Sequence, residues 1–119
     1  MIVWVEMLLE DREADVEALA GEMIDPRIRW FHDPERRAGR AIATSLGAAG
    51  EVAWDVYLFF DGHAEWQSRP PAPCQWIHQL DDSWADPTRR RFGDQLEPEL
   101  GRLLKSLLSV VETTEVLRR

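Results

Sequence analysis

The chain has 119 residues, 45% of them hydrophobic and 30% charged, and 22 acidic residues against 14 basic ones give a net charge of −8. This length and composition fit one globular domain and argue against a disordered chain. The acidic balance repels phosphate backbones, so we expect no nucleic-acid partner.

The only cysteine, Cys74, cannot form an internal disulfide, and residues 1–13 lack the basic head and cleavage site of a signal peptide. Charges interrupt every apolar run before it reaches the roughly 18 to 20 residues that cross a bilayer. We therefore predict a cytoplasmic protein without a membrane contact. Six tryptophans are unusual for this length, and such rings either fill a core or line a ligand pocket.

The first part of the chain alternates between strand and helix patterns. An apolar run at 2–9 predicts a strand. From 12 to 24, apolar residues recur every three or four positions, which predicts a surface helix that Asp11 can cap. The alternation at 27–31 predicts a second strand, half exposed.

A second helix is predicted after that strand. Asp33-Pro34-Glu35 combines a capping aspartate, a proline preset for the first helical position and an acid near the positive end of the helix dipole. Gly47 offers the end of this helix.

The stretch from Val52 to Phe60 is rich in β-branched and aromatic residues and carries one charge, which predicts a central strand covered on both faces. Asp61-Gly62 follows it, and this dipeptide accepts the positive φ angles of a two-residue hairpin turn. We therefore expect residues 63–66 to fold back as the next strand.

Beyond this hairpin, prolines make 68–73 a loop, 74–80 fits a short helix, and 81–86 returns to loop. Asp86-Pro87 repeats the cap-and-proline signal of a helix start, and we interpret the basic run Arg89-Arg90-Arg91 that follows as a solvated helix start.

Helical spacing of apolar residues then predicts a long last helix from Phe92 to Val111. Pro98 interrupts it, so we expect a kink or a restart near 93–97. Its surplus of leucines suits a homodimer contact, and 113–117 is either a frayed end or a brief strand.

The element order β-α-β-α-β-β-α over residues 1–119 predicts a single α/β domain with a small mixed β-sheet and flanking helices. This order is similar to that of the thioredoxin-like folds, in which a parallel βαβ unit precedes a β-hairpin and a closing helix. The resemblance concerns the order alone. A Cys-x-x-Cys pair would be needed where this chain reads EDRE, and the family's proline before the third strand is missing from GAAGE at 47–51. Dithiol chemistry is therefore not expected.

The segment from Trp66 to Trp84 is the main candidate site, because rings, prolines and polar residues gather there in one irregular stretch. We expect Trp66, Trp76, His78 and Trp84 to bind a ligand. The leading hypothesis is a non-enzymatic binding or interaction module that holds a small apolar molecule or a partner peptide and needs no cofactor.

The alternative hypothesis is a metal- or thiol-dependent enzyme centred on Cys74 and His78. On a helix from residue 73, Cys74, His78 and Asp82 would share one face, and zinc accepts such ligands. The simpler interpretation makes His78 a hydrogen-bonded structural residue and Cys74 a small buried hydrophobe. His32-Asp33 is a second polar pair, placed where α/β folds bind ligands, although Asp33 already suits a helix cap.

Overall fold

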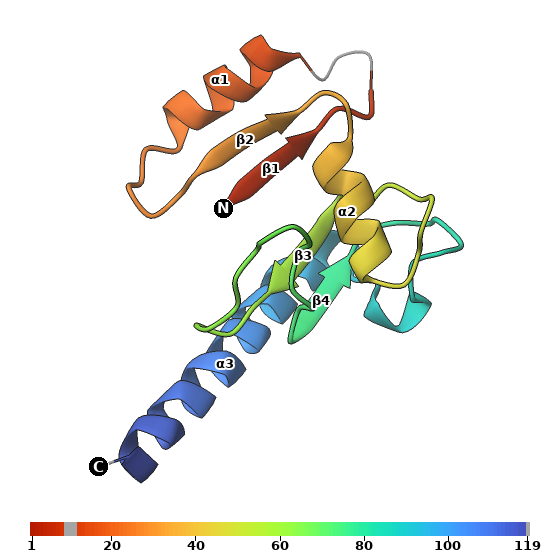
Figure 1. The fold of residues 1–119 in the computed structure, drawn as a ribbon. Helices are drawn as coiled ribbons and strands as arrows, with labels where there is room; N and C mark the ends of the chain where they lie inside the picture. The colour runs from red at the N-terminus through yellow and green to blue at the C-terminus, as the bar shows by residue number, and fades with distance from the viewer. Residues whose placement is uncertain (9–11, 119) are drawn as a thin grey trace. The chain divides into compact units, whose positions relative to one another are not determined.

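The structure is a computed structural model that describes residues 1–8 and 12–118 (Figure 1). For residues 111–116 and 118 it describes the backbone alone. The chain divides into two compact units, Met1–Trp54 with Gln67–Pro70 and Asp55–Trp66 with Pro71–Arg119. We call them the first and the second unit. Each has its own two-stranded sheet, and the order of helices and strands confirms the predicted α/β class and element order. The single domain stays a prediction.

The first unit is built on a parallel βαβ arrangement. Strand β1 (Ile2–Val5) pairs with β2 (Trp30–Asp33), and helix α1 (Glu13–Glu22) connects them (Figure 1). Val16 is the buried residue of α1. The predicted strand-helix-strand order is confirmed, with the second strand two or three residues later than its pattern indicated. The predicted cap Asp11 lies outside the described residues.

Asp33 positions helix α2 (Arg37–Ser45), because its two carboxylate oxygens accept the backbone N–H groups of Arg37 at 2.8 Å and Gly39 at 3.0 Å. The helix begins later than predicted, since Arg36 before it takes the left-handed conformation at φ 59°. Gly47 ends it at φ 87°, as predicted.

The segment 52–54 does not belong to a central strand. Its backbone lies against α2, where the Ala53 N–H donates to the Gly39 carbonyl at 2.9 Å. A Cβ at Gly39 would come within 2.7 Å of Val52 Cγ1, so only glycine permits this approach. Asp55 then turns the chain with φ 51°, and the strand predicted for 52–60 is shortened to β3 (Val56–Phe59).

The second unit contains an antiparallel sheet whose partner strand was predicted wrongly. Strand β3 pairs with β4 (Gln75–His78), with Tyr57 opposite Ile77 (Figure 1). The predicted partner 63–66 is irregular, and the helix predicted for 74–80 is replaced by β4.

The local chemistry of Asp61 explains the missing hairpin. Its side chain accepts the His63 N–H at 2.8 Å, and its carbonyl accepts the Ala64 N–H at 3.2 Å. These bonds form a local turn in which Gly62 does not need the positive φ that we predicted. The chain therefore continues as a long loop before it returns as β4.

A run of short and long helices closes the second unit. Asp86 caps the 3-10 helix η1 (Pro87–Arg89), and a second one, η2 (Gly93–Gln95), leads directly into α3 (Leu96–Arg118). Pro98 falls in the first turn of α3, where no intrahelical N–H bond is lost, so the predicted restart is confirmed. The backbone at 113–117 continues this helix. The buried apolar residues of the unit are Ile77, Leu80, Ala85 and Leu103.

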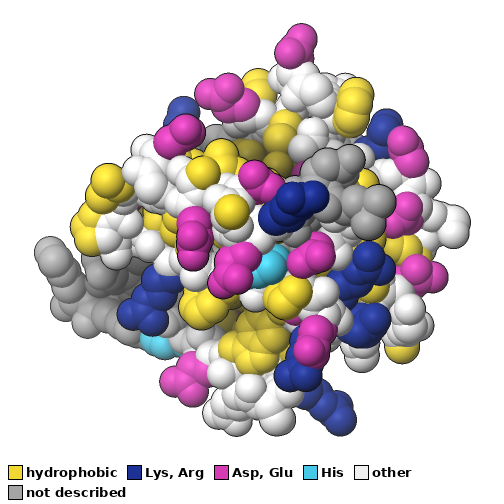
Figure 2. All heavy atoms as spheres, turned by 90° about the horizontal axis from the view of Figure 1, so that it is seen from above, with side chains coloured by type: hydrophobic (Ala, Val, Ile, Leu, Met, Phe, Trp, Pro, Cys, Tyr) yellow, Lys and Arg dark blue, Asp and Glu magenta, His cyan; other side chains and the backbone are white. Residues whose placement is uncertain are grey.

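The helices in the described part of the chain are too short or too polar to cross a bilayer. On the face seen in Figure 2, acidic, basic and hydrophobic side chains are mixed, and neither sign of charge covers a large area. A broad charged patch therefore does not mark a site on this face.

Candidate functional site

His78 is held from both sides at the end of β4. Its Nδ1 accepts the Leu80 N–H at 3.0 Å, and its Nε2 lies 2.7 Å from the Asp86 carbonyl oxygen. Nδ1 must therefore be the unprotonated nitrogen, and Nε2–H donates to Asp86. With the residue 1% exposed and both nitrogens in use, the imidazole fixes the loop at 79–86 instead of offering a lone pair to a ligand.

The predicted metal ligands are not brought together. The prediction depended on a helix from residue 73, but the segment forms strand β4 instead. Residues four positions apart in an extended chain lie about 13 Å apart. Cys74 is an exposed free thiol whose Sγ lies 3.2 Å from the Phe59 carbonyl oxygen, and Asp82 lies in the exposed part of the loop. Across the residues that the structure describes, His, Cys, Asp and Glu side chains form no group of three suited to a metal ion.

The three tryptophans of the predicted site have different surroundings. Trp66 is 43% exposed, whereas Trp76 on β4 and Trp84 in the following turn are half-buried. The Trp76 ring lies 5.6 Å from the His78 ring, measured between centroids. The enclosed indole N–H of Trp84 has no hydrogen-bond partner among the described residues. Of the predicted ligand-binding set, only Trp76 and His78 are in ring contact in the described part of the chain.

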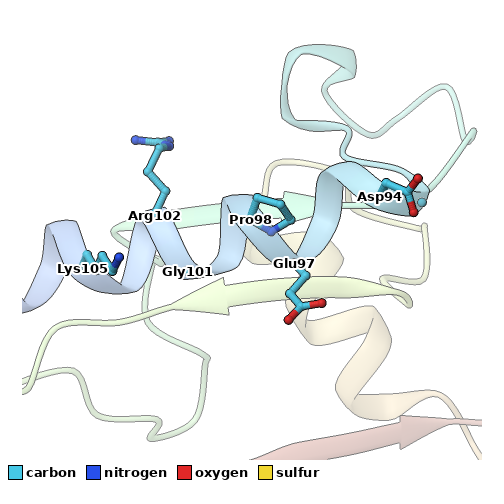
Figure 3. A pocket seen from close by; sticks show the side chains of 7 residues that line it. Asp94, Glu97, Pro98, Gly101, Arg102 and Lys105 are labelled. Carbon is cyan, nitrogen blue, oxygen red and sulfur yellow. The ribbon is translucent and has the colours of Figure 1, made fainter.

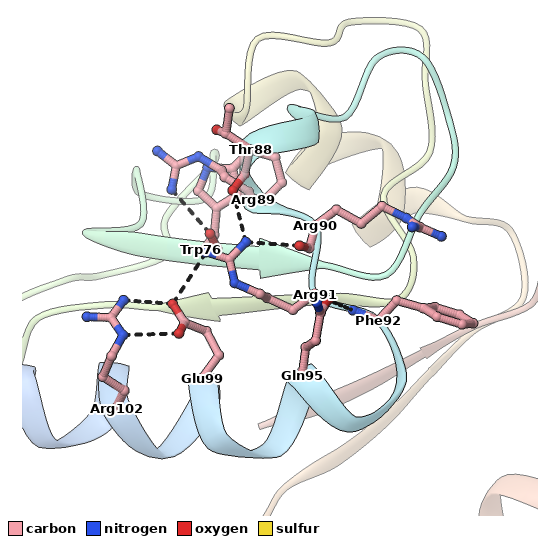
Figure 4. A network of polar contacts seen from close by, with 9 residues as sticks. All are labelled: Trp76, Thr88, Arg89, Arg90, Arg91, Phe92, Gln95, Glu99 and Arg102. Carbon is pink, nitrogen blue, oxygen red and sulfur yellow. Dashed lines mark hydrogen bonds and ion pairs between the residues drawn. The ribbon is translucent and has the colours of Figure 1, made fainter.

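Arg89 covers one face of Trp76 (Figure 4). The guanidinium carbon lies 5.1 Å from the ring centroid, and Nη1 donates to the Trp76 carbonyl oxygen at 3.2 Å. Arg89 Nε lies 3.5 Å from Asp86 Oδ2. A cation placed over an indole face and tied to the same residue's backbone holds the ring in one orientation.

The arginine side chains at 89–91 point alternately to opposite sides of the backbone. Arg90 is extended and forms a parallel bridge with His78, and the Arg91 N–H donates to the His78 carbonyl at 2.9 Å. Successive side chains of an extended chain point to opposite faces, so Arg89 and Arg91 point the same way and Arg90 points away from them (Figure 4). Arg90 reaches Asp81 at 2.7 Å and supports the loop.

Arg91 connects this extended stretch to α3 through Glu99. Its Nη2 lies 3.6 Å from Glu99 Oε1, and Arg102 grips the same carboxylate through two hydrogen bonds of 3.0 and 2.7 Å (Figure 4). The hydrogen bond from Arg102 lowers the pKa of Glu99, with smaller contributions from the charges of both arginines, while desolvation opposes the shift.

Asp86 combines three contacts at the start of η1. Its Oδ1 accepts the side-chain hydroxyl of Thr88 at 2.7 Å and the Thr88 N–H at 2.9 Å. These bonds lower the pKa of Asp86, and the nearby charge of Arg89 adds to the shift. The carboxylate therefore stays ionised where it supports both η1 and Arg89.

An open hollow of about 660 Å³ lies along the first turns of α3 (Figure 3). Asp94 and Glu97 line it together with Arg102 and Lys105, and Gly101 leaves room between them. Acidic and basic side chains line most of this hollow, and Pro98 is its one apolar side chain. The hollow is therefore polar and does not suit a purely apolar molecule.

The second polar pair of the sequence, His32-Asp33, separates into two roles in the first unit. Asp33 is the buried cap of α2 described above. His32 Nε2 lies 3.3 Å from Glu6 Oε2, within ion-pair distance, but it forms no aligned hydrogen bond. A charge attraction there requires a protonated imidazole.

The arginine contacts were missed at the level of sequence, where Arg89, Arg90 and Arg91 resembled a solvated helix start. Three consecutive arginines 13 to 15 residues after a tryptophan were the available signal. The sequence matches no protein-family model, and the comparisons with curated proteins and with solved structures found no match either.

Proposed function

We propose that the chain is a non-enzymatic interaction module that holds a partner peptide on the surface formed by Trp76 and Arg89. The observation that carries this proposal is the cation-π contact, because it presents a half-buried indole in a fixed orientation. Tryptophan and arginine are the residues that contribute most often to binding hot spots.

The surface around Trp76 is rigid. Strand β4 is paired with β3 along one edge, and the Arg91 N–H bonds to His78 on the other. Rigid aromatic anchors cost little side-chain entropy on binding, which favours affinity. A partner peptide fits such a strand surface better than a small apolar molecule does, since the hollow along α3, which could hold a small molecule, is lined by charges.

The enzymatic alternative draws no support from the geometry. A thiol enzyme would need a base within hydrogen-bond reach of Cys74, and the described contact of its Sγ is the Phe59 carbonyl. His78 has both nitrogens engaged elsewhere.

A cytoplasmic location and a homodimer remain part of the proposal. The free thiol of Cys74 suits a reducing compartment. On α3, Leu104 and Leu108 are 52% and 55% exposed one turn apart, which leaves apolar surface for a second copy. Leu104→Glu should then shift a dimer to a monomer in sedimentation velocity, and a wild-type chain that is monomeric at high concentration would remove the dimer from the proposal.

A displayed library of random twelve-residue peptides tests the binding function directly. We expect enrichment on the wild-type protein, and at least tenfold weaker binding of the enriched peptides to Trp76→Leu. Arg89→Gln provides a second variant that leaves the ring in place, and Phe31→Ala, at an exposed position of the first unit, is the matched control. Failure to enrich any peptide, or equal binding to wild type and Trp76→Leu, would refute the proposal.

A further inference from the structure

The two arginines that point the same way keep unused hydrogen-bond donors. Arg89 donates from Nη1 to a carbonyl, and Arg91 donates from Nη1 to the carbonyls of Thr88 and Arg90, both at 2.9 Å. In the described part of the chain, Nη2 of Arg89 makes no hydrogen bond or ion pair, whereas Nη2 of Arg91 makes a 3.6 Å ion-pair contact with Glu99 Oε1. With 38% and 32% of their side chains exposed, both groups are accessible from solvent.

The ion pairs around Asp86 and Glu99 contain more arginines than carboxylates. Among the described residues, Arg89, Arg91 and Arg102 form ion pairs with two carboxylates, Asp86 and Glu99, and Glu99 is shared between two arginines. A local surplus of positive charge in an acidic protein favours an anionic group on the partner.

The Glu99 contact shows which anion fits. Arg102 holds that carboxylate through Nε and Nη2, the planar two-bond geometry in which guanidinium groups recognise carboxylates (Figure 4). Arg91 reaches the same carboxylate from the opposite side with its Nη2. Nη2 of Arg89, and the Nη2 hydrogen of Arg91 that does not face Glu99, offer the same chemistry to a group from outside.

We infer that the partner is an acidic peptide, whose carboxylate binds the free N–H groups of Arg89 and Arg91 while a neighbouring apolar side chain packs on Trp76. This inference rests on the proposed function and specifies its partner. The carboxylate can come from an Asp or Glu side chain or from the end of the peptide chain. Binding of this kind weakens with salt, because the guanidinium groups are partly exposed.

Three synthetic probes separate these sources: acetyl-Leu-Glu-Leu-Glu-Leu-amide, its glutamine counterpart acetyl-Leu-Gln-Leu-Gln-Leu-amide, and the glutamine peptide with a free C-terminal carboxylate. NMR titration of the full chain measures their affinities. We expect one of the two carboxylate probes to bind at least tenfold more tightly than the neutral amide. A preference for the glutamate probe assigns the site to side chains, and a preference for the third probe assigns it to a chain end.

Two variants and a control locate the effect. Arg89→Gln and Arg91→Gln should each reduce the preference for the carboxylate probe to less than threefold, whereas Arg27→Gln, in an exposed ion pair with Asp25 of the first unit, should leave it unchanged. Equal affinities for all three probes, or an equal loss in Arg27→Gln, would overturn the inference. If library peptides still bind through Trp76 in that case, the proposed function stands without the acidic-peptide inference. If no peptide binds, the proposed function and the inference are both refuted.

Discussion

Replacing His78 by phenylalanine tests whether this residue is structural. The ring shape is kept, but the Leu80 N–H loses its acceptor and the Asp86 carbonyl loses its donor. A buried donor left without a partner costs about 1 to 3 kcal/mol, and the second bond contributes about 1 kcal/mol more. The free energy of unfolding should therefore fall by about 2 to 4 kcal/mol, which corresponds to a shift of about 1 to 2 M in the urea midpoint.

Urea unfolding followed by tryptophan fluorescence measures this shift, and hydrogen exchange at the Leu80 amide reports the lost bond directly. His78→Asn should restore part of the stability, because the asparagine oxygen can replace Nδ1 as an acceptor. His63→Phe, at an exposed position, is the control and should change the midpoint little. The structural role of His78 would be refuted by an unchanged midpoint together with unchanged protection of the Leu80 amide.

Three further results are expected. Gly39→Ala should destabilise the chain by roughly 1 to 3 kcal/mol in thermal unfolding, because its methyl group would overlap closely packed atoms. Gly101→Ala is the control: its methyl group meets no atom within 4 Å, so it should stabilise α3 by about 0.5 to 1 kcal/mol. Equal effects of the two substitutions would contradict the packing at Gly39. Arg102→Gln should raise the pKa of Glu99 toward its ordinary value of 4.5 in an NMR titration, and an unchanged pKa would show that the ion pair is not formed in solution. The folded state lowers the pKa of both Asp86 and Glu99. Their ionised forms therefore contribute stability that is complete above the ordinary pKa values of 3.8 and 4.5 and is lost as the pH falls through the lowered values. Urea midpoints that stay constant as the pH falls through this range would contradict these pKa shifts.

The parts of the fold that sequence reasoning predicted correctly depend on contacts within a few residues. Asp33 binds N–H groups four and six residues later, Asp86 binds Thr88, and Gly47 ends α2 through its own backbone angle. Pro98 signals the helix restart for the same reason, since its effect is limited to one turn. Such signals can be read from short windows of sequence.

Strand pairing and the site depend on contacts between distant residues. Phe59 pairs with Gln75, but Asp61-Gly62 offered a nearer turn that the Asp61 side chain closes in another way. Trp76 and His78 were selected because rings and polar residues gather in their stretch of the sequence. The extended backbone of β4 places His78 away from Cys74, which removes the predicted metal site. The arginine side chains alternate only because residue 90 is extended, which the helical interpretation of that run concealed.

Trp76, Arg89 and Arg91 are proposed to form a surface that binds a peptide carboxylate. The test is an NMR titration of isotopically labelled protein with each of the two carboxylate probes, acetyl-Leu-Glu-Leu-Glu-Leu-amide and the glutamine peptide with a free C-terminal carboxylate, followed in two-dimensional amide and indole spectra. With at least one probe we predict saturable shifts of the Trp76 indole and of the Arg89 and Arg91 amides, with little change at Arg27 in the first unit. Unchanged signals at Trp76, Arg89 and Arg91 at millimolar concentrations of both probes, or shifts confined to other residues, would refute this binding surface.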